Sequence, residues 1–294
     1  MNFQPFFLSE KILRVEELSP GYDDHASDVW RVQTDAREVI VRTSNIGDIK
    51  DASVFFWSVN RLFGVDPNNV FALEAVNRML SGFGAFRYPK VLGKYKADTE
   101  YLIVELLPGS LLTSLMELPD DELRKFGRNM AKIHGHQYDY VGNPSGTFKV
   151  GLDGANAHFI RAMREIVAKF YSDDRKIVDA LPEMERAFRD LPAPENASFV
   201  LVDIDPTQFL AENGVITGLV DTEAYVIAPR ELDFVALEYI LDGRSATLVA
   251  EGYETVLPMP DLQSVRRVYR YLYKLVDIQG GDDLDDWFSH PIFF

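Results

Sequence analysis

Two short stretches decide the fold of this chain: residues 199–210, FVLVDIDPTQFL, and residues 215–223, VITGLVDTE. Each has the pattern of a short apolar β-strand that delivers an acidic residue, Asp203 in the first and Asp221 in the second. The turn-forming segment ENG at 212–214 lies between them, as in a hairpin. Two carboxylates at neighbouring strand ends can hold a cation and accept a proton, so the pair is the candidate functional site. The simpler alternative is two carboxylates that only cap turns.

Length, composition and charge limit the possible domain organisation and the classes of binding partner. The 294 residues, 47% of them hydrophobic, suffice for one large domain or for two lobes around a cleft. The net charge of −16 disfavours nonspecific binding to nucleic acid and docking on an anionic membrane, and it is compatible with a cationic small-molecule substrate. Acidic chains are also common among soluble cytoplasmic proteins, so the charge alone does not identify a substrate.

Several kinds of chemistry and location are disfavoured by what the sequence lacks. There are no cysteines, which excludes disulfides, thiol catalysis and thiolate metal sites. No segment approaches the roughly 18 apolar residues of a membrane span, and the first residues lack the basic-then-apolar order of a secretory signal. We therefore expect a cytoplasmic protein with no nucleic-acid partner and no membrane partner.

The first part of the chain predicts a small, mostly antiparallel lobe. Residues 8–18 fit either a short helix or an edge strand. The polar segment 19–28 fits a loop over a phosphate, but an ordinary hairpin explains it as well, because no glycine-rich phosphate-binding motif is present. Strands are then predicted at 29–32, 38–42, 87–92 and 101–107, and helices at 48–63 and 70–80.

The second part of the chain is mainly helical. His134 and His136 lie two residues apart at a helix end, where side chains do not face each other, so we expect no metal site there. A loop is predicted at 140–156, and helices are predicted at 120–134, 157–171, 175–191 with an interruption at Pro182, 234–241, 245–257 and 262–276.

Together these patterns resemble the aminoglycoside phosphotransferase group of small-molecule kinases, a branch of the protein-kinase-like fold. That group carries HGDxxxxN after a strand, then a short hairpin, and then an aspartate of the IDF, IDW or IDxE type. Here LVDIDPTQ at 201–208 and LVDTE at 219–223 occupy these places. The segment PRELD at 229–233 is similar to the family segment that packs beneath this loop, where Asp233 would be structural.

The resemblance covers most of the chain and implies a two-lobed α+β fold. Residues 1–107 would form a small antiparallel-sheet lobe that covers the nucleotide. Residues 108–294 would form a larger, mostly helical lobe with the catalytic and metal loops and the substrate-binding helices. MAKIH at 130–134 is similar to the family's LAxLH segment in that larger lobe.

In the smaller lobe the resemblance assigns nucleotide-binding roles. Arg42 stands where the family has a phosphate-contacting lysine, and Glu74 lies on the helix whose glutamate pairs with that basic residue. Glu105 and Leu107 bound the hinge that would hold the purine of ATP or GTP through its backbone. A surface salt bridge explains Arg42 and Glu74 equally well.

In the larger lobe the resemblance assigns the chemistry of phosphoryl transfer, which needs positioning and charge neutralisation more than covalent catalysis. Asp203 would accept or orient the proton of the attacking hydroxyl. Asp221 would hold Mg²⁺, and Gln208 would add a second metal contact through its amide oxygen.

Four departures from the family pattern leave two functions open. Leu201 and Val202 replace His-Gly, Gln208 replaces the metal-binding asparagine, Arg42 replaces the lysine, and Asp205 stands where His or Asn is usual. One function is a phosphotransferase that acts on a hydroxyl of a small molecule, aminoglycoside-like or another metabolite. The other is a kinase-like module that binds nucleotide or metabolite without turnover. A protein kinase is disfavoured, because no APE-type segment follows Asp221.

The sequence identifies neither the acceptor substrate of the phosphate nor the oligomeric state. An acidic tail could meet a cationic substrate, although such tails are more often only solvated. Its carboxylates are those of Asp282, Asp283, Asp285 and Asp286.

Overall fold

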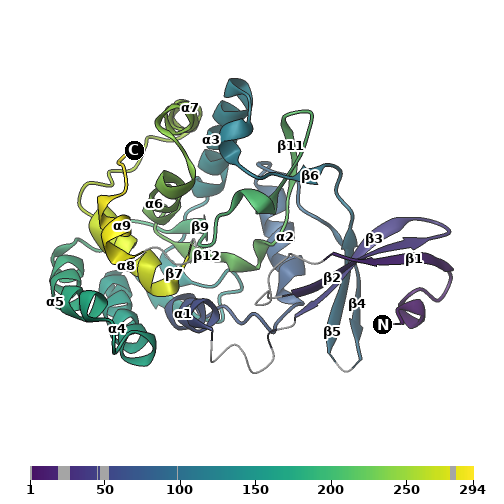
Figure 1. Cartoon of the computed structure of the whole chain (residues 1–294), viewed down its shortest axis with the longest axis horizontal. Coiled ribbons are helices and arrows are strands. Elements are labelled where there is room, and N and C mark those ends of the chain that lie inside the picture. The colour runs from purple at the N-terminus through teal and green to yellow at the C-terminus, as the bar shows by residue number, and fades with distance from the viewer. Residues whose placement is uncertain (1, 19–26, 45, 47–52, 98, 279–282) are drawn as a thin grey trace.

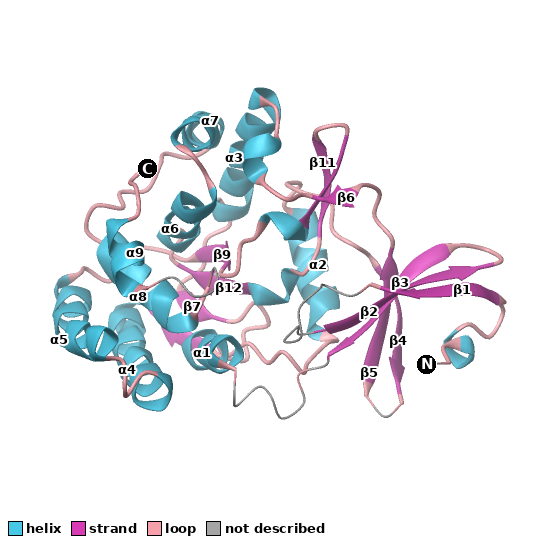
Figure 2. Ribbon diagram, viewed as in Figure 1, coloured by secondary structure: helices cyan, strands magenta, loops and turns pink. Residues whose placement is uncertain are grey.

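The computed structural model describes residues 2–18, 27–44, 46, 53–97, 99–278 and 283–294. A twisted sheet lies at one side of the molecule and a larger group of helices at the other (Figure 1). Figure 2 shows the same division by secondary structure. The predicted α+β fold, with an antiparallel-sheet lobe and a helical lobe, is confirmed. The boundary at 107/108 stays a prediction.

The smaller lobe is built on a five-stranded antiparallel sheet in the order β1-β2-β3-β5-β4. Its strands are β1 (Ile12–Glu17), β2 (Ser27–Thr34), β3 (Glu38–Ser44), β4 (Val91–Lys96) and β5 (Glu100–Glu105). Alternation along β2 buries Trp30 and Val32 and exposes Arg31 between them. For residues 8–18 the sequence predicts either a short helix or an edge strand. The structure shows the edge strand, β1. The β4–β5 hairpin extends farther than predicted, with Tyr95 opposite Tyr101.

Both faces of this sheet are covered by apolar side chains. On one face Val39 and Val41 pack with Phe3, next to the short 3₁₀-helix η1 (Gln4–Phe6). On the other face Leu102 and Val104 pack with Leu73 of helix α2 (Ala72–Gly82). Burial of apolar surface on both sides fixes the sheet and brings α2 against it.

The two predicted helices of the first part are confirmed, with shifted ends. Helix α1 (Val54–Phe63) begins where the Ser53 hydroxyl accepts the Phe56 N–H, and it ends at Gly64 in the left-handed conformation. The predicted start at 48 lies outside the described residues. Of the predicted phosphate-covering segment, only Ser27 and Asp28 are described. Helix α1 packs against helices α4 and α8 of the helical lobe.

The helical lobe contains most of the predicted helices. They are α3 (Asp120–His134), α4 (Leu152–Phe170), α5 (Arg175–Asp190), α6 (Glu231–Ile240), α7 (Gly243–Glu254), α8 (Arg266–Val276) and α9 (Leu284–Ser289), with a 3₁₀-helix η3 (Leu115–Glu117) before α3. The interruption predicted at Pro182 is wrong, because α5 runs through it. Pro182 is exposed there, so the carbonyl that loses its helical partner lies on an exposed turn. None of the described helices is long and apolar enough to cross a membrane.

Helices α3 and α7 lie in very close contact, which glycine permits. A Cβ added at Gly127 would lie 1.9 Å from the Val249 carbonyl oxygen, and one at Gly252 would lie 1.8 Å from the Arg124 carbonyl oxygen. The two backbones can approach only because neither glycine carries a side chain. The acidic first turn of α3 complements its dipole.

Two small sheets lie beside these helices and carry most of residues 199–210 and 215–223. One sheet has the order β8-β7-β12-β9 and the other the order β11-β10-β6. Their strands are β6 (Ser110–Leu111), β7 (Tyr140–Gly142), β8 (Lys149–Gly151), β9 (Ser198–Leu201), β10 (Phe209–Glu212), β11 (Val215–Leu219) and β12 (Tyr225–Ala228). The loop predicted at 140–156 therefore contains two short strands and the start of α4, because β7 finds its partner in β12.

The stretch 199–210 is two strands in different sheets rather than one. Asp205 caps the 3₁₀-helix η4 (Pro206–Gln208), and this helix separates β9 from β10. The hairpin β10–β11 forms as predicted, with Asn213 and Gly214 both at positive φ in its turn. Asp203 therefore lies in a loop between the two sheets, two residues after β9.

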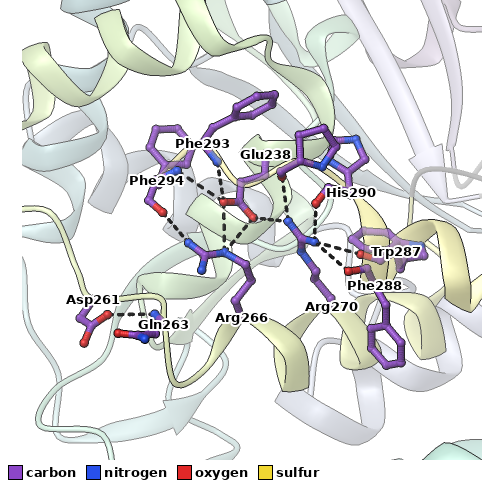
Figure 3. A network of polar contacts seen from close by, with 11 residues as sticks. Glu238, Asp261, Gln263, Arg266, Arg270, Trp287, Phe288, His290, Phe293 and Phe294 are labelled. Carbon is purple, nitrogen blue, oxygen red and sulfur yellow. Dashed lines mark hydrogen bonds and ion pairs between the residues drawn. The ribbon is translucent and has the colours of Figure 1, made fainter.

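A buried polar network fastens the C-terminal segment to α6 and α8 (Figure 3). Glu238 is fully buried and pairs with Arg266 at 3.2 Å and with Arg270 at 2.7 Å. It also accepts the backbone N–H groups of Phe293 and Phe294. Arg270 donates to the backbone carbonyls of Trp287, Phe288, His290 and Pro291. The C-terminal segment is thus held by charge-assisted hydrogen bonds to its backbone.

Candidate functional site

The loop that carries Asp203 is fixed from below by buried polar contacts. The Leu201 N–H donates to the Asp233 carboxylate at 3.0 Å, and His134 Nε2 lies 2.9 Å from the same carboxylate. From the other side, the Gln208 amide donates to the Asp203 carbonyl oxygen. Asp233 has the structural position expected of it, and His134 belongs to the same network. These hydrogen bonds hold the backbone of the loop at Leu201 and at Asp203.

The Asp203 carboxyl is a weaker acid than an ordinary aspartate. Burial, followed by the charges of Asp205 and Asp221, raises its pKa to about 6. A carboxyl with a pKa near the working pH is suited to accept a proton from a hydroxyl and to release it again. The influence of Asp221 also shows that the structure brings the two aspartates close enough to interact.

Asp221 lies two residues after strand β11 in a left-handed conformation, with φ of 53°, and its side chain is 57% exposed. Its carboxylate accepts a hydrogen bond from Arg42 Nη1 at 3.2 Å. Arg42 comes from β3 of the other lobe and is itself buried. This ion pair joins the two lobes, because its members are 179 residues apart in the sequence.

Arg42 has a second acidic partner that the sequence interpretation missed. Its Nη2 pairs with the Glu223 carboxylate and donates to the Ser27 hydroxyl at 2.9 Å. Burial opposes the charge of Arg42, but Glu223 and then Asp221 outweigh it and raise the Arg42 pKa. Burial raises the pKa of Glu223, with Arg42 acting against it. The available signal was the IDxE-type spacing, which places Glu223 two residues after Asp221.

The predicted pairing of Arg42 with Glu74 is wrong. Glu74 pairs with Lys94 of β4 at 2.6 Å and with Arg78 at 2.8 Å, and Lys94 lowers its pKa. The reason is the orientation of α2, which turns Leu73 and Asn77 inward and leaves Glu74 facing the edge strand. A role for Glu74 in nucleotide binding stays a prediction.

Asn77 takes the inward position of α2 that faces the segment after Asp221. The hydroxyl of Thr222, in the 3₁₀-helix η5 (Thr222–Ala224), donates to the Asn77 side-chain oxygen. The Asn77 side-chain nitrogen donates to the Pro89 carbonyl oxygen at 2.9 Å. The segment after Asp221 is therefore tied to α2 by a neutral amide and not by an ion pair.

The amide oxygen of Gln208 points to the backbone rather than outward. It accepts the Asp205 N–H at 3.1 Å and completes a capping box with the Asp205 side chain. Gln208 is also buried. The second metal contact predicted for this oxygen would therefore require that capping bond to be given up or shared.

The donor set can still fit Mg²⁺. Across the described parts of the chain, no three His, Asp or Glu side chains converge as a ready metal site. Mg²⁺ does not require one, since it is usually held by one or two carboxylates together with substrate phosphates and water. The half-exposed Asp221 is the protein ligand that suits this arrangement.

The predicted hinge lies next to the strand that leads to Asp221. Leu107 is buried against β11, where a Cβ at Gly218 would lie 2.4 Å from a Leu107 methyl carbon. The Glu105 N–H donates to the Lys90 carbonyl oxygen at 2.9 Å, and its carboxylate pairs with Arg87 at 2.5 Å. This particular amide is therefore already used within the lobe.

The acidic tail has partners of its own. Lys176 of α5 pairs with Asp283 at 2.7 Å and with Asp285 at 2.5 Å, and Asp286 accepts the Asp283 N–H at the start of α9. Figure 1 places α5 and α9 at the end of the molecule away from β10 and β11. Asp282 lies outside the described residues. The described tail carboxylates thus cap and brace α9.

No protein-family sequence model and no curated protein matches this chain. Solved structures do match it. A macrolide 2′-phosphotransferase from Brachybacterium faecium is 12% identical over 97% of this chain and 90% of its own, with a TM-score of 0.61. A spectinomycin phosphotransferase in complex with ADP and spectinomycin is 11% identical over 93% and 84%, with a TM-score of 0.63. A GDP complex of aminoglycoside 2′-phosphotransferase-IIIa is 15% identical over 93% and 86%, with a TM-score of 0.60. The chain thus has the protein-kinase-like fold of the aminoglycoside phosphotransferases, and the resemblance seen in its sequence is confirmed at the level of fold.

Proposed function

We propose that this chain is a Mg²⁺-dependent phosphotransferase that moves the γ-phosphate of ATP or GTP to a hydroxyl of a small molecule. The observation that carries the proposal is the environment of Asp203, a half-buried carboxyl in a hydrogen-bonded loop, whose pKa is raised to about 6. The fold adds support, because its solved neighbours include phosphotransferases in complex with ADP and with GDP. The acceptor would be an aminoglycoside-like molecule or another metabolite. The net charge of −16 is compatible with a cationic one.

The proposed chemistry assigns one step to Asp203. Its carboxylate accepts the proton of the acceptor hydroxyl while the hydroxyl oxygen bonds to the γ-phosphorus. The bond between that phosphorus and the β,γ-bridging oxygen breaks, and the nucleoside diphosphate leaves. The raised pKa favours acceptance of the proton, and because about 6 still lies below neutral pH, the carboxyl releases that proton to water afterwards.

The remaining residues bind and orient the nucleotide. Mg²⁺, when bound, neutralises phosphate charge, and Asp221 is the residue that would hold it. Arg42 would contact the phosphates from β3, and Gln208 would keep the loop in shape. At the hinge, Leu107 and the carbonyl of Glu105 would face the purine, because the Glu105 amide is used.

Two observations favour a second candidate, a kinase-like module that binds nucleotide or metabolite without turnover. Arg42 engages Asp221 directly, so a phosphate and a metal ion must both compete with an existing ion pair. The Gln208 oxygen is committed to the Asp205 N–H. Both contacts reduce the number of groups that are free to act on a triphosphate.

The two candidates are separated by binding and turnover together. Thermal shifts with ATP and GTP, with and without Mg²⁺, would measure binding. Phosphate transfer to a panel of aminoglycosides, macrolides and amino sugars would measure turnover in the wild type, in Asp203→Ala and in the exposed control Asp179→Ala. We expect nucleotide binding in all three proteins, and turnover reduced by about 10²-fold or more in Asp203→Ala alone. Binding without any Asp203-dependent turnover would establish the second candidate instead.

A further inference from the structure

We propose that Glu223 is the positioning residue for Arg42, and that it holds the guanidinium toward the nucleotide phosphates once a metal ion engages Asp221. This inference rests on the proposed nucleotide site. It gives Glu223 the role that the resemblance had assigned to Glu74, and it explains why an arginine stands at position 42.

The contacts of Arg42 divide between two carboxylates. Nη2 pairs with Glu223 and donates to Ser27, while Nη1 donates to Asp221 at 3.2 Å. The arginine side chain is only 9% exposed, and a buried guanidinium needs an acidic partner to stay in place. Glu74 does not supply one, because Lys94 and Arg78 already occupy its carboxylate.

The two carboxylates differ in what else they can do. Asp221 is 57% exposed and is the protein ligand that suits Mg²⁺, so a bound cation and Arg42 would compete for it. Glu223 is 31% exposed and lies on η5, which Thr222 ties to Asn77 of α2. Its position therefore depends on α2 rather than on the metal. When Asp221 turns to a cation, Glu223 still holds Nη2.

The shape of arginine suits this division. A guanidinium has five N–H donors in a rigid fork, so one terminal nitrogen can stay on Glu223 while the other turns from Asp221 to a phosphate oxygen. A lysine ammonium carries its three donors on one nitrogen, so a carboxylate and a phosphate must both converge on that single atom, whereas the arginine fork reaches them from two nitrogens. Arg42 and Glu223 thus form a matched pair, with the acidic partner on the metal loop instead of the helix.

Nucleotide affinity tests the pair. The dissociation constants of ADP and ATP would be measured by calorimetry on the full chain, in EDTA and in saturating Mg²⁺. The variants are Glu223→Gln, Arg42→Gln and their double variant, with Glu74→Gln as the competing candidate and the exposed Glu254→Gln of α7 as the matched control. We expect Glu223→Gln to weaken binding about tenfold or more in Mg²⁺ and less in EDTA, where Asp221 still holds Arg42. Glu254→Gln should leave binding within about twofold, and Glu74→Gln should weaken it less than Glu223→Gln does.

Two further readouts separate positioning from other roles. If Glu223 acts through Arg42, its replacement has no added effect in the Arg42→Gln background. The Mg²⁺ concentration that half-saturates binding should be unchanged in Glu223→Gln. Glu223→Asp keeps the charge but draws it back by one methylene, so it should bind with intermediate affinity even if the glutamine variant folds poorly.

Several results would overturn the proposal. A raised Mg²⁺ requirement, with full affinity restored by more Mg²⁺, would make Glu223 a metal ligand. An equal loss of nucleotide affinity in Glu74→Gln would also refute it, and so would a loss of affinity on replacing Glu223 in the Arg42→Gln background. Turnover that does not depend on Asp203 would refute the proposed catalytic role of Asp203 but leave this binding test intact. A wild type that binds no nucleotide would overturn both.

Discussion

Replacement of Asp203 by asparagine should stabilise the protein at neutral pH, although it removes the proposed proton acceptor. In the folded chain the Asp203 pKa is about 6, against an ordinary value of 3.8, chiefly because burial disfavours the carboxylate. Each unit of pKa difference between folded and unfolded states corresponds to about 1.4 kcal/mol. Ionised Asp203 therefore costs the folded state about 3 kcal/mol, which a neutral amide of similar shape would avoid.

The size of this destabilising effect changes with pH in a defined window. Below about pH 4 the carboxyl is protonated in both states, so it does not affect stability. Between about pH 4 and 6 the folded chain keeps the proton that the unfolded chain releases, so the free energy of unfolding falls as pH rises. Above about pH 6 both states are ionised, and the full cost of about 3 kcal/mol applies.

Equilibrium urea unfolding in EDTA, at several pH values from 4 to 8, would measure the difference between wild type and Asp203→Asn. We expect the difference to be small near pH 4 and to grow to about 3 kcal/mol in favour of the variant by pH 7.5. Asp179→Asn on the exposed side of α5 is the control and should show no such growth. A difference that does not vary with pH, or a variant less stable than wild type at pH 7.5, would refute the reasoning.

Three other predictions follow from the same structure. The kcat/KM of any transfer reaction should rise about tenfold per pH unit up to pH 6 and then level off, because Asp203 must be ionised to accept a proton; a profile flat from pH 4.5 to 7 would contradict this role. Glu238→Gln should lower the free energy of unfolding by about 3–5 kcal/mol and expose the C-terminal segment to proteases, since it leaves the buried Arg270 and the partly buried Arg266 short of a partner. Arg267→Met, which breaks only a surface pair, is its control and should change little in urea unfolding. Gly252→Ala should destabilise by about 1–3 kcal/mol, because its methyl group meets the Arg124 carbonyl oxygen, whereas Gly154→Ala in α4 has room and should be neutral or stabilising by thermal melt.

Local features were readable without the structure because neighbouring residues determine them. Helix α3 has the predicted bounds, since its apolar spacing and acidic first turn are contained within the helix. The β10–β11 turn follows from Asn213 and Gly214, which accept positive φ more readily than other residues. This hairpin also sets the position of Asp221, two residues after β11, whereas Asp203 lies outside it in the loop between β9 and η4.

Features that join distant elements were predicted less well. The sequence placed Glu74 on the correct helix, but its partner depends on the rotation of α2 against the sheet, which turns it to Lys94. Likewise, the order of residues shows that Gln208 follows Asp203 by five positions, but only the folded loop shows that its amide caps that loop. Such contacts depend on tertiary packing that no local pattern encodes.

By itself, the sequence determined the fold class and the pair of aspartates, because hydrophobic periodicity and turn chemistry act over a few residues. Only the tertiary structure decided which acidic side chain pairs with which basic side chain. Arg42 lies 179 residues from Asp221, and the choice of Glu223 over Glu74 as its partner follows from how β3, α2 and η5 pack. A charge pairs with the acid that packing brings within reach, and that distance is a property of the whole fold.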